Sequence, residues 1–159
     1  MQVKDTDTIY CTECSYAEKS DRYGMLEKVS EVGEEIRYVS DWAHLIRSRA
    51  KAELDTGNAL PITLPSAIHA INPETSKFEE VGRGNFTLKE NKIIVEGIVN
   101  DEPFLREVST APFASVPFKA GVFLEVQNAN EIWRILPDDG KQVMRIVNLI
   151  KAIYAKNNK

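Results

Sequence analysis

The sequence predicts an α+β fold: a small antiparallel β-barrel capped by a C-terminal helix, preceded by an amphipathic helix and an irregular acidic N-terminal segment. Three observations predict this arrangement. Residues 66–137 alternate apolar and polar side chains in short runs that end at turn residues, as antiparallel strands do. The segments 39–57 and 139–156 instead repeat apolar residues at helical spacing. Residues 9–35 are polar, acidic and poorly periodic.

Length and composition place the chain among globular proteins. It has 159 residues and a mass of 17.9 kDa, a size typical of one domain with at most a small appendage. Hydrophobic residues make up 43% and charged residues 28%, which are ordinary values for a soluble domain. A chain of this length buries roughly two-thirds of its unfolded surface, so its fold does not require a disulfide framework.

The charge and the apolar runs argue against two classes of protein. A net charge of −4 makes nucleic acid an unfavourable main partner. No apolar run approaches the ~20 residues of a membrane-spanning helix, and the N-terminus has no apolar signal core. We therefore expect a cytoplasmic protein.

Charge is unevenly distributed along the chain. Residues 1–36 carry a net charge of −5, whereas residues 140–159 carry five bases and no acid. Blocks of one sign are usually solvated faces. The alternative for the basic block is a weak peripheral contact with an anionic membrane surface.

The chain divides into three expected segments. Residues 1–38 form an acidic segment with a CxxC pair, residues 39–65 a helix and a proline-rich linker, and residues 66–159 the barrel with its C-terminal helix. Ser40 suits a helix N-cap and Gly57 lies past the last turn, which predicts a helix over 41–55. Two prolines within 60–65 predict a linker rather than an element. The apolar stripe of the helix consists of Trp42, Leu45, Ile46, Ala50 and Leu54.

Six strands and a final helix are expected in the third segment. Gly82-Arg83-Gly84 is interpreted as a turn into one of the strands, with no following helix that could bind an anion. The final helix is expected from about Asp139 to Lys156, with Asp138 or Asp139 as its N-cap. Its continuous apolar stripe is expected to pack on the sheet. The expected strands are Ala67–Ile71, Gly84–Leu88, Lys92–Val99, Phe104–Val108, Gly121–Gln127 and Glu131–Leu136.

This order of elements resembles the pleckstrin-homology superfold and its GRAM-type relatives. In those domains an antiparallel meander is followed by one amphipathic helix, which plugs one end of a bent barrel. The resemblance implies an architecture, and it does not by itself imply a function.

Cys11 and Cys14 have the spacing of half a zinc site. A closed site needs two further ligands, but the chain has no third cysteine, and its two histidines, His44 and His69, are not paired. A redox role would require a thioredoxin-like context, which is absent. Besides a zinc site completed within this chain, two alternatives follow: the cysteines are free thiols and no cofactor is bound, or zinc is bound with ligands from upstream sequence or a partner chain.

No residue pattern indicates catalysis. The sequence contains no nucleophile elbow and no phosphate-binding loop. His69 alternates with apolar neighbours on an expected strand and is best interpreted as a packed or rim residue. Adjacent carboxylates such as Glu79-Glu80 lie at turns, where nothing indicates the facing walls of a cleft. We expect a protein that is not an enzyme on its own.

The segment 110–118 is unusually apolar for a connection between strands. It is either buried beneath the N-terminal helix or part of a hydrophobic contact surface. The candidate interaction surface consists of Pro112, Phe113, Pro117, Phe118 and Trp42.

A series of short motifs resembles the region that follows the catalytic domain in a group of bacterial 1-acyl-glycerol-3-phosphate acyltransferases. The motifs are the Tyr10–Tyr16 knuckle, Tyr23-Gly24-Met25-Leu26, Asp41-Trp42, the Gly82-x-Gly84 pair, and Trp133-Arg134-Ile135-Leu136-Pro137. The catalytic part of such enzymes uses a His-x4-Asp motif. That motif is absent, because Arg49 stands five residues after His44 and Glu74 five after His69.

The resemblance implies a non-catalytic accessory module of a lysophosphatidate-type acyltransferase. Its helix and apolar loop would pack on the catalytic domain, on another protein or on a membrane surface, and Cys11 and Cys14 would be the second half of a zinc ribbon. The alternative is a stand-alone binding or assembly protein with a pleckstrin/GRAM-like fold, including a homodimer. An accessory module predicts an exposed apolar patch, and a lipid-headgroup binder predicts bases converging at one barrel mouth.

Overall fold

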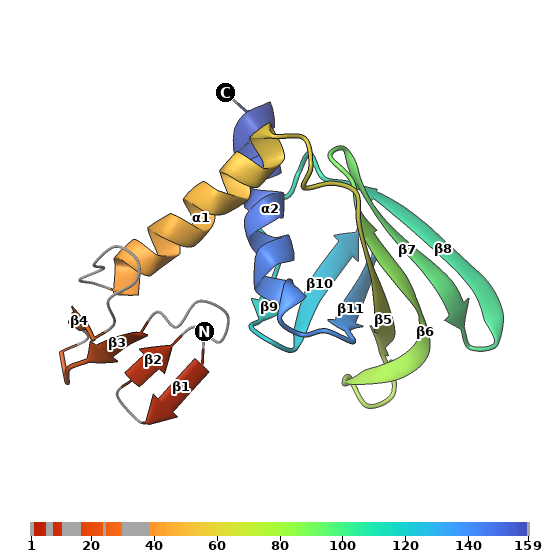
Figure 1. Cartoon of the computed structure of the whole chain (residues 1–159). Coiled ribbons are helices and arrows are strands. Elements are labelled where there is room, and N and C mark those ends of the chain that lie inside the picture. Colours follow the sequence, from red (N-terminus) through yellow and green to blue (C-terminus); the bar gives the residue numbers. More distant parts are fainter. Residues whose placement is uncertain (1, 6–7, 11–16, 24, 30–38, 159) are drawn as a thin grey trace. The chain divides into compact units, whose positions relative to one another are not determined.

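The structure is a computed structural model that describes residues 2–5, 8–10, 17–23, 25–29 and 39–158 (Figure 1). The chain divides into two units, Met1–Ser48 and Arg49–Lys159, and the boundary falls within helix α1 (Val39–Asp55).

The N-terminal unit contains a four-stranded antiparallel sheet in the order β1-β2-β3-β4. Its strands are β1 (Gln2–Asp5), β2 (Thr8–Tyr10), β3 (Ala17–Ser20) and β4 (Leu26–Lys28). Asp21 shapes the turn after β3, because its Oδ1 accepts hydrogen bonds from the N–H groups of Tyr23 and Met25, both at 2.8 Å. This region was expected to be irregular. Strands of three or four residues are too short to give a clear period of two, so sequence periodicity did not indicate them.

Helix α1 confirms the predicted helix, but among the stripe residues whose side chains are described, only those near its C-terminal end are buried. Ala50 and Leu54 belong to the hydrophobic core of the second unit. Ile46 is 42% exposed. Gly57 ends the helix with φ +74°, and its N–H donates to the carbonyl of Leu54 at 3.1 Å.

The second unit is a seven-stranded antiparallel sheet followed by helix α2 (Gln142–Asn157), which lies beside β9 and β10 (Figure 1). The strand order is β8-β7-β6-β5-β11-β10-β9, so the first strand of this sheet pairs with its last. The predicted fold class is therefore confirmed. The strands are β5 (Ile62–Ile71), β6 (Phe78–Leu88), β7 (Lys92–Val99), β8 (Glu102–Ser109), β9 (Phe118–Lys119), β10 (Phe123–Asn128) and β11 (Glu131–Pro137).

The expectation of a linker up to residue 65 was wrong, because β5 begins at Ile62. Pro65 pairs with Asn85 of β6, while pairing with β11 begins only at Ser66. The carbonyl of Pro65 accepts the N–H of Asp138, on the side away from β6. Pro65 therefore lies just past the end of β11, where a missing N–H removes no ladder hydrogen bond.

The core lies between the inner face of the sheet and α2. The stripe predicted for the final helix is buried except for Tyr154, which is half-buried. Asp139 does not cap α2 directly: it accepts the N–H of Lys141 at 3.1 Å, and the helix begins at Gln142 without a side-chain cap. The largest fully buried side chains of this core include Ile68, Phe86, Leu88, Ile93, Leu124, Ile135, Ile146, Leu149, Ile150 and Ile153.

Side chains link β8 to β11, two strands that share no backbone pairing. The ring of Phe104 meets the ring of Trp133 edge-to-face, with centroids 5.7 Å apart. Arg106 lies over Phe104 at 4.6 Å from the centroid and bonds Glu131 at 3.1 Å. Aromatic packing and an ion pair thus join the edge strand β8 to the inner strand β11.

Three glycines bring β6 and β7 unusually close together. Gly84 faces Gly97 in the register, and Gly82 faces Val99. A Cβ at position 84 would lie 1.9 Å from the carbonyl oxygen of Glu96, and one at position 97 would lie 2.6 Å from the Cα of Gly84. The interpretation of 82–84 as a turn was wrong, because these residues lie inside β6. Glycine is required there by close backbone approach.

We predict that Gly84→Ala lowers the free energy of unfolding by about 1–3 kcal/mol or more, because the clash is with backbone that cannot move without distorting the sheet. Urea denaturation followed by circular dichroism measures the change. Asn85→Ala, at the exposed neighbouring position, is the control. Equal midpoints for the two variants would show that the strands separate at little cost.

Candidate functional site

The predicted interaction loop, between β8 and β9, is anchored at both ends. Thr110 is buried, its hydroxyl donates to the carbonyl of Glu90 at 2.7 Å, and its own carbonyl accepts the N–H of Phe113 at 3.1 Å. Val116 is buried in the core, and Phe113 packs against that core. At the far end the carbonyl of Pro117 accepts the N–H of Glu125 of β10. The loop therefore holds a fixed conformation.

The loop leads into an exposed apolar surface at the edge of the sheet. Phe118 is 38% exposed and Val122 is 39% exposed. Phe118 pairs with Leu124, which puts it on the face that α2 covers. Nζ of Lys151, from α2, lies 5.9 Å from the centroid of the Phe118 ring. We name this surface the β9 rim, and it consists of Pro117, Phe118, Lys119, Val122 and Lys151.

Strand β9 is an edge strand. It pairs with β10 on one side, and within the described residues no strand pairs with its other side. Lys119 and Lys151 make no ion pair with any residue whose position is described. The β9 rim thus combines an unpaired strand edge, exposed apolar side chains and two positive charges: Lys151 lies on the face of Phe118, and Lys119, which pairs with Phe123, lies on the opposite face.

The structure brings only some of the predicted site residues to this rim. Pro117 and Phe118 belong to it, Pro112 is exposed in the preceding loop, and Phe113 is half-buried. Cys11 and Cys14 lie outside the described residues, as does the side chain of Trp42, so the zinc site and the role of Trp42 stay predictions. Among the residues that are described, no group of three His, Cys, Asp or Glu side chains could hold a metal ion.

Sequence reasoning missed a row of ionisable side chains on the outer face of the sheet. The register places Glu125 beside Arg134, Arg134 beside His69, and His69 beside Glu80, across β10, β11, β5 and β6. Arg134 donates to Oε1 of Glu125 at 2.7 Å through Nη2. Nε2 of His69 lies 3.9 Å from Oε2 of Glu80. The four residues come from separate strands, so no local motif indicates the row.

Arg134 is held between two aromatic rings. Its guanidinium carbon lies 3.8 Å from the centroid of Phe78 and 4.0 Å from that of Phe123. Because Glu125 compensates its charge and the two rings are in contact with it, Arg134 is poorly suited to bind an external anion. This clamp ties β6, β10 and β11 together.

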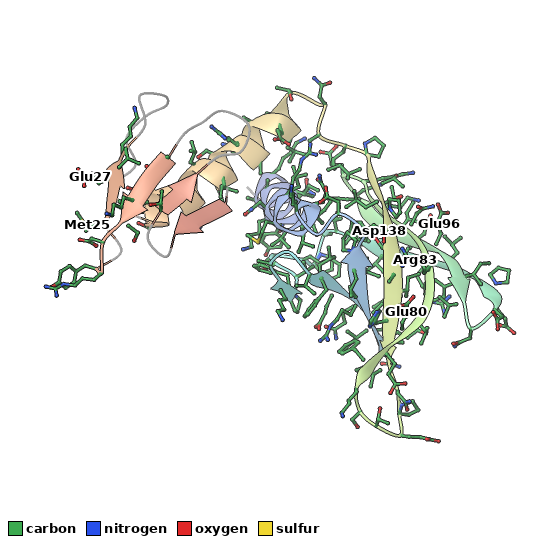
Figure 2. All side chains as sticks on the ribbon, turned by 60° about the horizontal axis from the view of Figure 1, so that its bottom comes forward. Met25, Glu27, Glu80, Arg83, Glu96 and Asp138 are labelled. Atoms are coloured by element: carbon green, nitrogen blue, oxygen red, sulfur yellow. The ribbon has the colours of Figure 1, made fainter. Side chains whose placement is uncertain are left out.

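A shallow cavity of about 510 Å³ lies beside the row, where β6 meets the β7–β8 turn. Arg83 is paired with Asp138. Figure 2 shows Arg83 and Asp138 together, with Glu80 and Glu96 in the same region. The cavity is lined by Glu80, Val81, Gly82, Arg83, Ile98, Asn100 and Asp101.

Comparisons with known proteins give likeness to solved structures but to no sequence family. No protein-family model matches the chain. No curated protein matches it either. Among solved structures, the chain is similar to the Ran-binding domain of the nuclear complex component Nup2 from Ashbya gossypii, with 13% identity and a TM-score of 0.46, over 59% of this chain and 92% of that one.

We predict that Arg134→Lys lowers the free energy of unfolding by about 1 kcal/mol, because lysine keeps the charge but loses the planar group that stacks on Phe78 and Phe123. Thermal and urea denaturation measure the loss. Arg83→Lys is the matched control, and we expect it to cost less because its ion pair is exposed. Equal losses in both variants would contradict the clamp.

Proposed function

We propose that the chain is a non-catalytic binding module that takes an extended peptide segment of a partner protein at the β9 rim. The unpaired edge of β9 carries this proposal. An exposed strand edge offers main-chain donors and acceptors to an added strand. Phe118 and Val122 next to that edge offer apolar contacts that distinguish one segment from another.

The rim is suited to binding because it is already in place. The hydrogen bonds of Thr110 and Pro117 and the burial of Val116 hold the loop. A preorganised surface loses less conformational entropy when a ligand binds. Lys119 and Lys151 favour a partner segment that carries acidic residues beside its apolar ones.

The outer-face row supports a non-catalytic interpretation. Arg134 donates a hydrogen bond to Glu125 and is stacked between two aromatic rings. Nε2 of His69 lies 3.9 Å from Oε2 of Glu80. Neither arrangement presents a base and a nucleophile at hydrogen-bonding distance, as general acid–base or covalent catalysis requires.

A lipid surface is a less favoured ligand. Arg145 and Lys156 of the C-terminal basic block are paired with Glu53 and Glu90. A hydrogen bond from Lys156 to Glu90 and the attraction between their charges raise the pKa of this lysine. Of the helices in the described residues, none is long and apolar enough to cross a membrane.

The narrower hypothesis names the partner as the catalytic domain of a lysophosphatidate-type acyltransferase. It rests on the resemblance of the sequence motifs alone. An immunoblot of the source cell with an antibody against this chain tests it. A band well above 17.9 kDa is the expected result if catalytic and accessory regions share one chain. A band near that mass would contradict this arrangement and favour a free-standing module.

Selection from a phage-displayed random peptide library tests the peptide-binding function. We expect enriched peptides to combine alternating apolar residues with acidic ones, and we expect Phe118→Asp to weaken binding of the corresponding synthetic peptides at least tenfold. The substitution puts a carboxylate where the apolar contact forms, next to the unpaired edge. Fluorescence polarisation measures the affinity.

Ile71→Asp is the matched control, because Ile71 is an exposed apolar residue at the end of β5, outside the rim. It should leave affinity unchanged. Selection without enrichment, or equal effects of the two variants, would overturn the proposed site. Sedimentation over a range of concentrations identifies the case in which a second copy of the chain is the partner.

A further inference from the structure

The β7–β8 hairpin carries a second exposed apolar surface. Ile98 is 52% exposed and Leu105 is 57% exposed. In the register Ile98 faces Pro103, and Leu105 faces Glu96, so these side chains share the outer face of the hairpin. We name Ile98, Pro103 and Leu105 the hairpin patch.

The cavity beside β6 adjoins this patch, because Ile98 lines both. Among its lining residues Ile98 has an exposed apolar side chain and Glu80 and Asp101 carry carboxylates, whereas Val81 packs against the hydrophobic core. An exposed apolar side chain beside two carboxylates suits a long side chain with an aliphatic stem and a charged end.

Negative charge around the cavity is largely uncompensated. Arg83, the one base among the described residues that line it, is paired with Asp138. Asp101 and Glu96 make no ion pair with any residue in the described part of the chain. Glu80 faces His69, which carries a charge only when protonated. The local field therefore favours a positively charged occupant.

Strand addition at β8 is hindered at two positions. Pro103 has no N–H to donate. The carbonyl of Leu105 already accepts a hydrogen bond from Nη1 of Arg106 at 3.0 Å. Both features reduce the number of main-chain groups with which an added strand could pair. A partner at this hairpin is therefore recognised through its side chains.

We infer that the cavity receives a lysine or arginine side chain of a partner polypeptide, whose neighbouring apolar residue lies on Ile98 and Leu105. The cationic group lies near the carboxylates of Glu80 and Asp101, and its stem packs on Ile98, which lines the cavity. This surface is separate from the β9 rim and prefers a partner segment of opposite charge. The inference therefore does not depend on the proposed function.

Titration of the ¹⁵N-labelled chain with two short synthetic peptides tests the inference by NMR. One peptide is arginine flanked by leucines, and the other has glutamate in place of arginine. We expect saturable shifts of the Ile98, Asp101 and Leu105 amides with the arginine peptide only. Binding of the glutamate peptide at the same amides, or no saturable shifts there with the arginine peptide, would overturn the inference.

The double variant Glu80→Gln with Asp101→Asn removes both charges at nearly constant shape, and asparagine tolerates the φ of +64° at position 101. We expect it to weaken arginine-peptide binding by roughly tenfold. Glu74→Gln, on an exposed turn outside the cavity, should change nothing. Equal affinity of the double variant and the original chain would contradict the assignment.

Two further measurements distinguish the hairpin site from the β9 rim and from self-association of the chain. Phe118→Asp should leave arginine-peptide binding unchanged, so failure of the β9 rim and failure of the hairpin site are distinguishable. In the absence of peptide, chemical-shift changes of the hairpin amides that grow with protein concentration would identify a second copy as the occupant. That result would overturn the assignment to a separate partner.

Discussion

The pairing of β5 with β11 is the constraint on which the arrangement of the second unit depends. It runs from Ala70–Trp133 to Ser66–Pro137 and joins residues more than sixty positions apart. Through it the meander curls back on itself, and α2 follows directly from the strand that completes the closure. The same register places Arg134 beside His69 and carries Asp138 to Arg83. The position of Arg134 in the outer-face row and the Arg83–Asp138 pair beside the cavity both follow from this ladder.

Closure leaves the sheet with two edges, and they differ chemically. At β8 a proline and a carbonyl already bonded to Arg106 leave little for another strand to pair with. At β9 the edge is short, held in place by its loop, and bordered by exposed Phe118 and Val122. Strand β9 has only two residues and follows Pro117, so main-chain pairing proposed there is confined to Phe118–Lys119, whereas the partner proposed for the hairpin is recognised through side chains. The two surfaces also carry opposite charge, which favours different partner segments.

Sequence periodicity predicted the six longer strands and both helices, because alternation and helical spacing are local signals. Periodicity failed where the role of a residue depends on contacts with strands distant in the sequence. The prolines at 61 and 65 indicated a linker, yet Pro65 is tolerated in β5 because β11 ends beside it. Gly82 and Gly84 indicated a turn, yet they serve close strand approach. Part of the β9 rim was predicted from the unusual apolarity of 110–118. The Arg134 clamp was not, because its partners come from separate strands and only the register brings them together.

The most direct test of peptide binding at the β9 rim is an experimental structure of the chain with a peptide selected from the library. The account predicts that the peptide main chain pairs with Phe118–Lys119 and that an apolar side chain contacts Phe118. It also predicts an acidic residue near Lys119 or Lys151. A peptide bound elsewhere, or bound at the rim without main-chain pairing to β9, would contradict the account.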